Sequence, residues 1–311
     1  MARNPAEKSK SSRGSKIPKS VLFDEHDSLK ALKAEAHPGE DLEDVMRRKC
    51  RDMVAHGKKY RWEGPPFDPS ELASIHGISV EESDEDIGGE GCIFPRMGEV
   101  VIQYRAGRTI ERQRFTICHE LAHTCFGNAF EFVRHHAAPE EDDPAHKKFE
   151  NLCDLGAAEL LMPHDEFSAD MSNDIMCLSR MDVLRGRYIS SIEATLRRML
   201  DFTAHSCAAV FLTDEAFKEF PATPGQMRVQ WMWKSKSFGS YLKPGTLAPR
   251  TSSALRDAPT MSRPFSKTRE TWWISGKPRS WYVEAVRLPV IPGLKSYAKV
   301  AALLHGRLPK V

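Results

Sequence analysis

The sequence lacks the long apolar runs and the paired cysteines that mark membrane and secreted proteins. No apolar run approaches the ~20 residues of a membrane-spanning helix. The basic, Ser-rich N-terminus has no apolar core of the kind found in secretory signals. The seven cysteines are an odd number without a C-x-x-C pair, which favours reduced thiols over a disulfide framework. We therefore expect a cytoplasmic chain with no membrane partner.

The sequence also lacks a strong net charge. Its formal charge of +2 predicts neither nucleic acid nor a membrane surface as a partner. Residues 1–37 are rich in Lys, Ser and Ala, and their composition predicts a disordered basic tail. Five cations of this tail could contact nucleic acid, although we prefer a merely solvated tail: Lys8, Lys10, Arg13, Lys16 and Lys19.

The 311 residues are enough for about two domains. Residues 38–200 show helical spacing of apolar residues from Leu42, with Gly57 as a candidate stop, and Asp68 can cap a second helix. Short strands are predicted at 78–80, 92–94 and 99–104. This mixture predicts an α+β domain.

The most informative stretch, residues 114–123, contains a His-Glu-x-x-His motif made by His119, Glu120 and His123. Residues four apart lie on one face of a helix, so the two imidazoles can share a zinc ion while the glutamate acts as general base. The neighbouring residues are mostly apolar, which predicts a buried helix whose polar groups a metal would satisfy. The alternative is a core helix with hydrogen-bonded histidines.

A second helical pattern runs over residues 149–162 and ends at Pro163. A catalytic zinc usually has three protein ligands, and Glu150 can supply the third. Asp154 lies one turn further on the same face and can accept the free N–H of a zinc-bound histidine. The alternative is that both carboxylates belong to a solvent-facing acidic stripe.

These motifs resemble the ImmA/IrrE family of zincin metallopeptidases. The resemblance covers roughly residues 40–200 and implies that His119, His123 and Glu150 bind Zn²⁺ and that Glu120 is catalytic. The matching residues are 67–69, 72–73, 77–80, 114–117, 119–123, 150 and 157–163. The chain departs from the family pattern at Cys118, Ala122 and Gly156, which we expect to affect packing rather than ligands.

Residues 188–200 predict a capped helix, which resembles the small helical closing segment of the family. Residues 201–311 predict a second α+β domain, and the resemblance implies a sensor or regulatory role for it, with a GAF-like fold as one candidate. Its expected strands are 207–212, 227–233 and 281–286. Alternation in the second strand places four residues on one face: Met227, Val229, Trp231 and Trp233.

Three tryptophans of this region are interleaved with basic residues: Trp272, Trp273 and Trp281. Such a pattern could stack on single-stranded nucleic acid, although core tryptophans are the interpretation we prefer. Cys92 precedes the strand before the metal helix, and its thiolate could fill the open zinc position and inhibit the site; an ordinary buried thiol is the alternative. Tyr104 and Tyr188 are candidates for stabilising an oxyanion.

Two functions fit the sequence. The first is a zinc endopeptidase that hydrolyses a peptide bond, with Glu120 moving the proton. The resemblance implies that the substrate is a helix-turn-helix repressor, cleaved in a stress or DNA-damage response, with single-stranded DNA as a possible activator. The second is a non-catalytic zinc-containing regulatory protein that docks a repressor or DNA. An unligated glutamate beside an open zinc position favours the enzyme.

Overall fold

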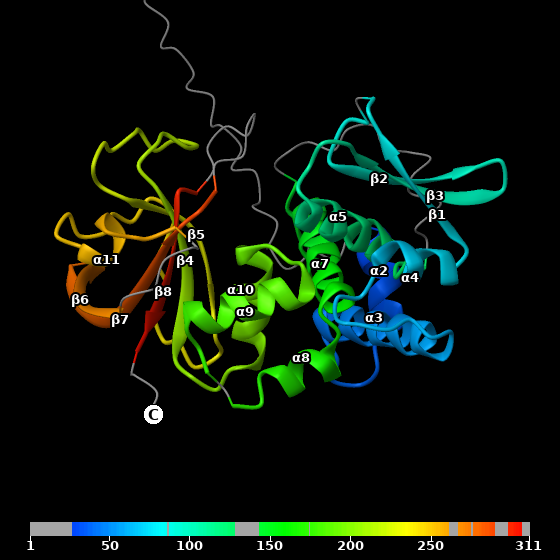
Figure 1. Ribbon diagram of the computed structural model, residues 1–311, viewed down its shortest axis with the longest axis horizontal. Coiled ribbons are helices and arrows are strands. Elements are labelled where there is room, and N and C mark those ends of the chain that lie inside the picture. The colour runs from blue at the N-terminus through cyan, green and yellow to red at the C-terminus, as the bar shows by residue number, and fades with distance from the viewer. Residues whose placement is uncertain are drawn as a thin grey trace, which may run out of the picture.

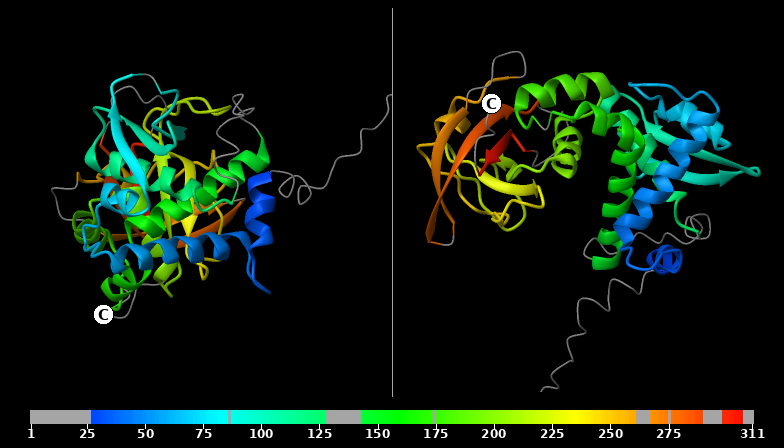
Figure 2. Two further views of the ribbon diagram at one scale, coloured as in Figure 1. Left: turned by 90° about the vertical axis from the view of Figure 1, so that its right-hand side faces the viewer. Right: turned by 90° about the horizontal axis from the view of Figure 1, so that it is seen from below.

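The computed structural model describes residues 27–85, 87–127, 143–173, 175–260, 267–274, 276–289 and 298–306. Two sheets lie at opposite ends of the molecule with helices between them (Figures 1 and 2). The mixed α+β class is thereby confirmed. A helix of the length and apolarity needed to cross a bilayer does not occur in these residues.

The first helices of the described chain are α2 (Asp27–Ala34), α3 (Leu42–Lys59) and α4 (Pro69–Ile75). Helix α3 begins with a capping box in which Asp41 accepts the backbone N–H of Asp44 at 2.9 Å. Its continuation past Gly57 corrects the expected stop. A Cβ at Gly57 would lie 2.8 Å from Cδ1 of Leu72, so this glycine serves the packing of α3 against α4.

Helix α2 corrects part of the expected disordered tail. Leu29 and Leu32 are almost completely buried, because α2 packs across α3. An eight-residue helix would not be stable alone, so this contact explains why it forms where composition predicts disorder. Residues 1–26 of the expected tail lie outside the described residues.

The smaller sheet consists of β1 (Ile78–Ser83), β2 (Gly91–Arg96) and β3 (Glu99–Arg105) in the order β1-β3-β2. Strand β1 pairs with β3 in parallel, and β2 pairs with β3 antiparallel. The β2–β3 turn contains Gly98 at φ +90°, a conformation that favours glycine. All three strands occur where they were predicted, and β2 is an edge strand.

Helices α5 (Ile110–His123) and α7 (Pro144–Leu161) pack side by side at the centre of the molecule (Figure 1). They approach each other closely at Gly156, where a Cβ would lie only 2.7 Å from the Cβ of Ala122. A large residue at position 156 would therefore separate the two helices. This explains the departure from the family pattern at Gly156.

The next helices are α8 (His164–Asp170), α9 (Leu178–Tyr188) and α10 (Ile192–Phe202). The single helix expected at 188–200 is thus wrong at its start. Tyr188 ends α9, Ile189 adopts the left-handed conformation at φ 49°, and the side chain of Ser191 caps α10. The prediction treated this stretch as one continuous helix, although Ile189 ends α9 and a new helix begins after Ser191.

The larger sheet has the order β5-β4-β8-β7-β6, with a short helix, α11 (Ser253–Arg256), beside it. Its strands are β4 (Cys207–Thr213), β5 (Arg228–Lys234), β6 (Lys267–Ile274), β7 (Lys277–Arg287) and β8 (Val300–His305). One face joins the core that contains α9 and α10, and the other covers a second, smaller core. Because the main core includes side chains from β4 and β8, the domain boundary at residue 200 stays a prediction, as does a GAF-like fold.

Strand β5 contains a bulge that overturns one predicted face. The register between β4 and β5 shifts by one residue, which leaves Gln230 as the extra residue. Met227 and Val229 consequently pack into the smaller core, whereas Trp231 and Trp233 pack against the main core. The sequence alternation placed all four on one face, and one inserted residue reverses every side chain beyond it.

A buried ion cluster fixes α10 to α3 and α7. The carboxylate of Glu159 is fully buried and accepts from Arg198 at 2.6 Å, from Arg51 at 2.9 Å and from Arg47 at 3.4 Å. Burial alone would raise the pKa of Glu159, and these arginines hold it below its ordinary value. Arg198 also donates to the carbonyl of Met162 at the end of α7.

We predict that Glu159→Gln lowers the free energy of unfolding by ~3–5 kcal/mol, because it leaves the Arg198 guanidinium buried without an anion. Arg51→Gln, which removes a partner whose side chain is 46% exposed, should lower it by less than about 1 kcal/mol. Urea unfolding followed by circular dichroism measures both. Equal losses for the two variants would contradict the assignment of Glu159 as the centre of the cluster.

Candidate metal centre

The two histidines of the motif lie at the C-terminal end of α5, where α5 packs on α7. Because they are one helical turn apart, the rings of His119 and His123 are neighbours, with centroids 5.0 Å apart. Both rings are partly exposed, although the helix around them is buried. The predicted burial of this helix is confirmed. Helix α7 supplies side chains that contact the two imidazole rings.

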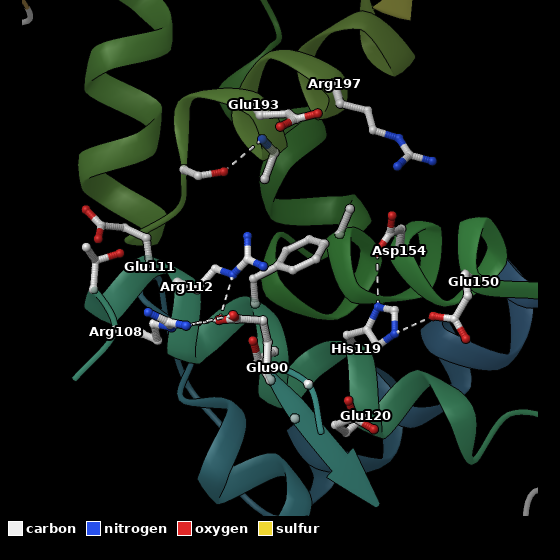
Figure 3. A pocket seen from close by; sticks show the side chains of 18 of the residues that line it. Glu90, Arg108, Glu111, Arg112, His119, Glu120, Glu150, Asp154, Glu193 and Arg197 are labelled. Carbon is white, nitrogen blue, oxygen red and sulfur yellow. Dashed lines mark hydrogen bonds and ion pairs between the residues drawn. The ribbon is translucent and has the colours of Figure 1, made fainter. Parts of the chain in front are cut away.

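His119 lies between two carboxylates of α7 (Figure 3). Its Nδ1 is 3.0 Å from Oδ1 of Asp154, and its Nε2 is 3.2 Å from Oε2 of Glu150. Burial alone would lower the pKa of His119, but Asp154 and Glu150 outweigh it and raise the pKa to about 10. Asp154 thus occupies the place of a partner that orients a ligating histidine, and Glu150 faces the nitrogen that would bind metal.

His123 has the same arrangement with different partners. Its Nδ1 is 3.5 Å from Sγ of Cys153, and its Nε2 is 3.9 Å from Oε2 of Glu120. Burial raises the pKa of the Cys153 thiol well above its ordinary value, which favours the neutral thiol. Each Nδ1 therefore contacts α7, and each Nε2 faces a carboxylate.

This donor set fits a divalent metal ion. His119, His123 and Cys153 form a group of possible ligands whose atoms lie within 4.8 Å of one another. Glu150 and Asp154 add two carboxylates around His119, although among the described residues Glu150 is not a member of this group. Cys153 was not predicted as a ligand, because the sequence alone cannot distinguish a buried ligating cysteine from a cysteine that only packs in the core.

Glu120 lies beside the two rings, and its side chain is buried. Burial raises its pKa to about 7, against the lowering effect of His119. A Cβ at Gly91 would lie 2.9 Å from Oε1 of Glu120 and 2.4 Å from Cγ2 of Thr116. Gly91 therefore allows β2 to lie directly against the motif. The only sequence signal for this role was a glycine at the entry of a predicted strand.

A cavity of about 1720 Å³ opens in front of these residues. Its walls come from β2, α5 and α7 on one side and from α10, β4 and β5 on the other. Cys92 lines it from β2 and, among the described residues, does not belong to the group of possible ligands around the histidines. Its inhibitory role stays a prediction. Burial, followed by the charge of Glu120, raises the pKa of its thiol.

Neither tyrosine proposed for the oxyanion is placed for that role. Tyr188 is fully buried and donates to Asp170 at 2.8 Å, outside the residues that line the cavity. Tyr104 lies on β3, which is the central strand of its sheet, and does not line the cavity either. Both assignments are therefore corrected.

Two of the three predicted nucleic-acid tryptophans are core residues. Trp272 and Trp281 are 0% and 5% exposed and contact each other edge to face with centroids 6.0 Å apart. The indole N–H of Trp272 donates to Glu270. Stacking of bases on these two rings is thereby excluded, and Trp273, at 66% exposed, is the exception.

Comparison with known proteins agrees with this geometry. A solved structure described as a Mycobacterium tuberculosis transcriptional regulator is similar in fold, with a TM-score of 0.55 at 15% identity, over 91% of this chain and 80% of that chain. No curated protein matches the chain. The profile of the M78 peptidases, described as the IrrE N-terminal-like domain, matches residues 73–199, which include both histidines, Glu120 and Glu150. Residues 73–199 are therefore similar to the IrrE N-terminal-like domain of the M78 peptidases, which confirms the resemblance to ImmA/IrrE proteins over this part of the chain.

Proposed function

We propose that the chain is a zinc-dependent endopeptidase that cleaves a transcriptional repressor. One observation carries this proposal: the Nε2 atoms of His119 and His123 face the carboxylates of Glu150 and Glu120 at the wall of a large cavity. Two imidazoles and one carboxylate are a ligand set of catalytic zinc sites, and a further unligated carboxylate has a use only in catalysis.

In this proposal His119, His123 and Glu150 hold the zinc ion. When bound, zinc supplies a Lewis acid that polarises a carbonyl and makes water more acidic. Glu120 accepts a proton from the attacking water and returns it to the leaving amine. Asp154 and Cys153 contact the Nδ1 atoms and so fix the orientation of both rings, which leaves Nε2 for the ligand bond.

The edge strand β2 supplies a place for an extended peptide. Its Gly91, Cys92, Ile93 and Phe94 line the cavity, and β3 pairs with only one of its two edges. An extended substrate segment can add to the other edge through backbone hydrogen bonds, beside Glu120. The cleaved segment is accordingly an extended or locally unfolded part of the repressor.

The nature of the substrate and of the signal rests on the family resemblance. A helix-turn-helix repressor as substrate, a stress or DNA-damage response, and single-stranded DNA acting on the C-terminal region are parts of the proposal that follow from that resemblance. The similarity in fold to a transcriptional regulator supports a role in regulation.

A second function is favoured by one specific observation. Two histidines and a cysteine lie within 4.8 Å of one another, and nitrogen and sulfur ligands are typical of structural zinc. If Cys153 were the third ligand, the protein would be a zinc-containing regulator that docks a repressor or DNA without cleaving it. The contact of Cys153 with Nδ1 of His123, rather than with Nε2, is why we prefer the peptidase.

We predict that Glu120→Gln binds zinc normally and loses at least about a hundredfold in cleavage rate, because the amide cannot accept a proton from water. Zinc content by plasma mass spectrometry and cleavage by gel electrophoresis measure the two properties. Asp165→Asn, which changes an exposed carboxylate whose side chain is 85% exposed, is the matched control. Wild-type cleavage by the Glu120 variant would remove this residue from the mechanism.

The third ligand can be identified by a pair of variants on α7. Glu150→Gln should weaken zinc binding by more than about a hundredfold, because it removes a ligand, whereas Cys153→Ser should weaken it by about tenfold or less, because it alters only the support of His123. Competition with a chromophoric chelator measures both dissociation constants. If Cys153→Ser weakened zinc binding more than Glu150→Gln, Cys153 would be the third zinc ligand and the structural site would be favoured.

The substrate is tested with a helix-turn-helix repressor from the genome that encodes this chain. Incubation of the two full-length proteins with zinc should produce discrete fragments, and a chelator should prevent them, because the metal is removed. A single-stranded oligonucleotide added in a parallel reaction tests the proposed activator. Stable binding without fragments in every condition would favour the docking function instead.

A further inference from the structure

The wall of the cavity that faces the metal centre contains a cation that is not used by the proposed chemistry. Arg197 lines the cavity from α10, and its guanidinium carbon lies 4.2 Å from the ring centre of Trp233 on β5. Stacking on an aromatic face fixes the plane of a guanidinium and leaves its N–H groups free to donate sideways. The position of Arg197 is therefore set by contact with the larger sheet.

Arg197 differs in its partners from three other arginines of the cavity, and Arg287, the fourth, donates to the backbone carbonyls of Ala258 and Arg256. Arg108 makes a bidentate pair with Glu90, and Arg112 reaches the same carboxylate at 3.4 Å. Arg185 pairs with Asp182. Within the described part of the chain, the guanidinium of Arg197 has no carboxylate at ion-pair distance.

The nearest acid in sequence on the same face, Glu193, is already engaged. Its Oε1 accepts the indole N–H groups of Trp231 at 2.8 Å and of Trp233 at 3.3 Å. Burial raises the pKa of Glu193, and the two indoles and the charge of Arg197 act against that rise. The carboxylates across the cavity are also engaged, because Glu150 and Asp154 contact His119.

In Figure 3, Arg197, Asp154, His119 and Glu150 lie in the right half of the view, whereas Arg108 and Arg112 lie in the left half. Glu193 and Arg197 line the same cavity as His119, Glu150 and Asp154. A peptide held at the metal centre would therefore present its neighbouring side chains to Arg197.

We propose that Arg197 determines specificity by binding a carboxylate of the peptide substrate, namely an Asp or Glu side chain close to the bond that is cut. This inference rests on the proposed peptidase function. An oriented guanidinium without a carboxylate partner gains most from an acidic group, because the pair forms bidentate, charge-assisted hydrogen bonds inside a cavity. Basic side chains at the same position are disfavoured by repulsion.

The first test uses a random peptide library that is acetylated at the N-terminus and amidated at the C-terminus, digested by the zinc-loaded full chain. Mass spectrometry of the products gives the residue frequencies at each position around the cut. We expect about three- to tenfold enrichment of Asp and Glu at one fixed position. Arg197→Gln should abolish this enrichment, and Arg197→Glu should replace it with Lys and Arg.

Arg112→Glu is the matched control, because it makes the same change of charge in the same cavity. It should leave the acidic enrichment in place. Arg197→Lys, which keeps the charge without the planar stack on Trp233, should retain part of it. Loss of enrichment in the Arg112 variant as well as in the Arg197 variants would overturn the proposal in favour of a general field effect.

The second test reads binding instead of cleavage and so separates this inference from the proposed function. Zinc-loaded Glu120→Gln, immobilised, should retain acidic peptides from the same library, and Glu120→Gln with Arg197→Gln should not. If acidic peptides are retained in this way while the wild-type chain cleaves nothing, the proposed peptidase function is wrong and the binding of acidic side chains by Arg197 is supported. If the wild-type chain cleaves and neither test shows an acidic preference, the function stands and the role of Arg197 is overturned.

A parallel library with free C-termini distinguishes the two sources of a carboxylate. Enrichment in the amidated library identifies an acidic side chain, as proposed. Enrichment of peptides only when the C-terminus is free would assign Arg197 to a terminal carboxylate and overturn the side-chain assignment. Circular dichroism and the near-ultraviolet signal of the tryptophans check that each variant is folded.

Discussion

The close packing of α5 on α7 is the constraint on which the candidate site depends. At the crossing, position 156 has no space for a side chain, because a Cβ there would lie 2.7 Å from the Cβ of Ala122. With the helices this close, residues 150, 153 and 154 of α7 reach both imidazoles of α5. The spacing i, i+3, i+4 puts these three side chains on one face, so a single helix supplies a candidate ligand and both orienting contacts.

The parts of the site that follow from helical periodicity were predictable from the sequence. Two histidines four residues apart and an acidic pair four residues apart need only local geometry, and the structure brings Glu150 and Asp154 to His119. Cys153 and Gly91 were not predictable in the same way. Their roles arise from which residues of another element lie opposite them, and a single sequence contains no information about that contact.

The larger sheet shows where alternation fails as a guide. A single extra residue, Gln230, turns Trp231 and Trp233 toward the main core, although strict alternation puts them beside Val229. Composition was equally ambiguous for the tryptophans near the C-terminus, because an aromatic residue beside a basic one occurs both in cores and on binding surfaces. Burial decides between them, and it depends on which face of β6 and β7 is covered.

The bulge also has a consequence for the site. Because it turns Trp231 and Trp233 toward α10, both indoles reach Glu193, and Trp233 supports Arg197 at the cavity wall. Trp233 therefore helps to form the cavity that contains the metal centre, and Trp231 contacts its wall through Glu193. A change in the packing of β5 on α10 would alter this wall directly. The larger sheet and the metal centre could therefore be coupled without a long series of intervening residues.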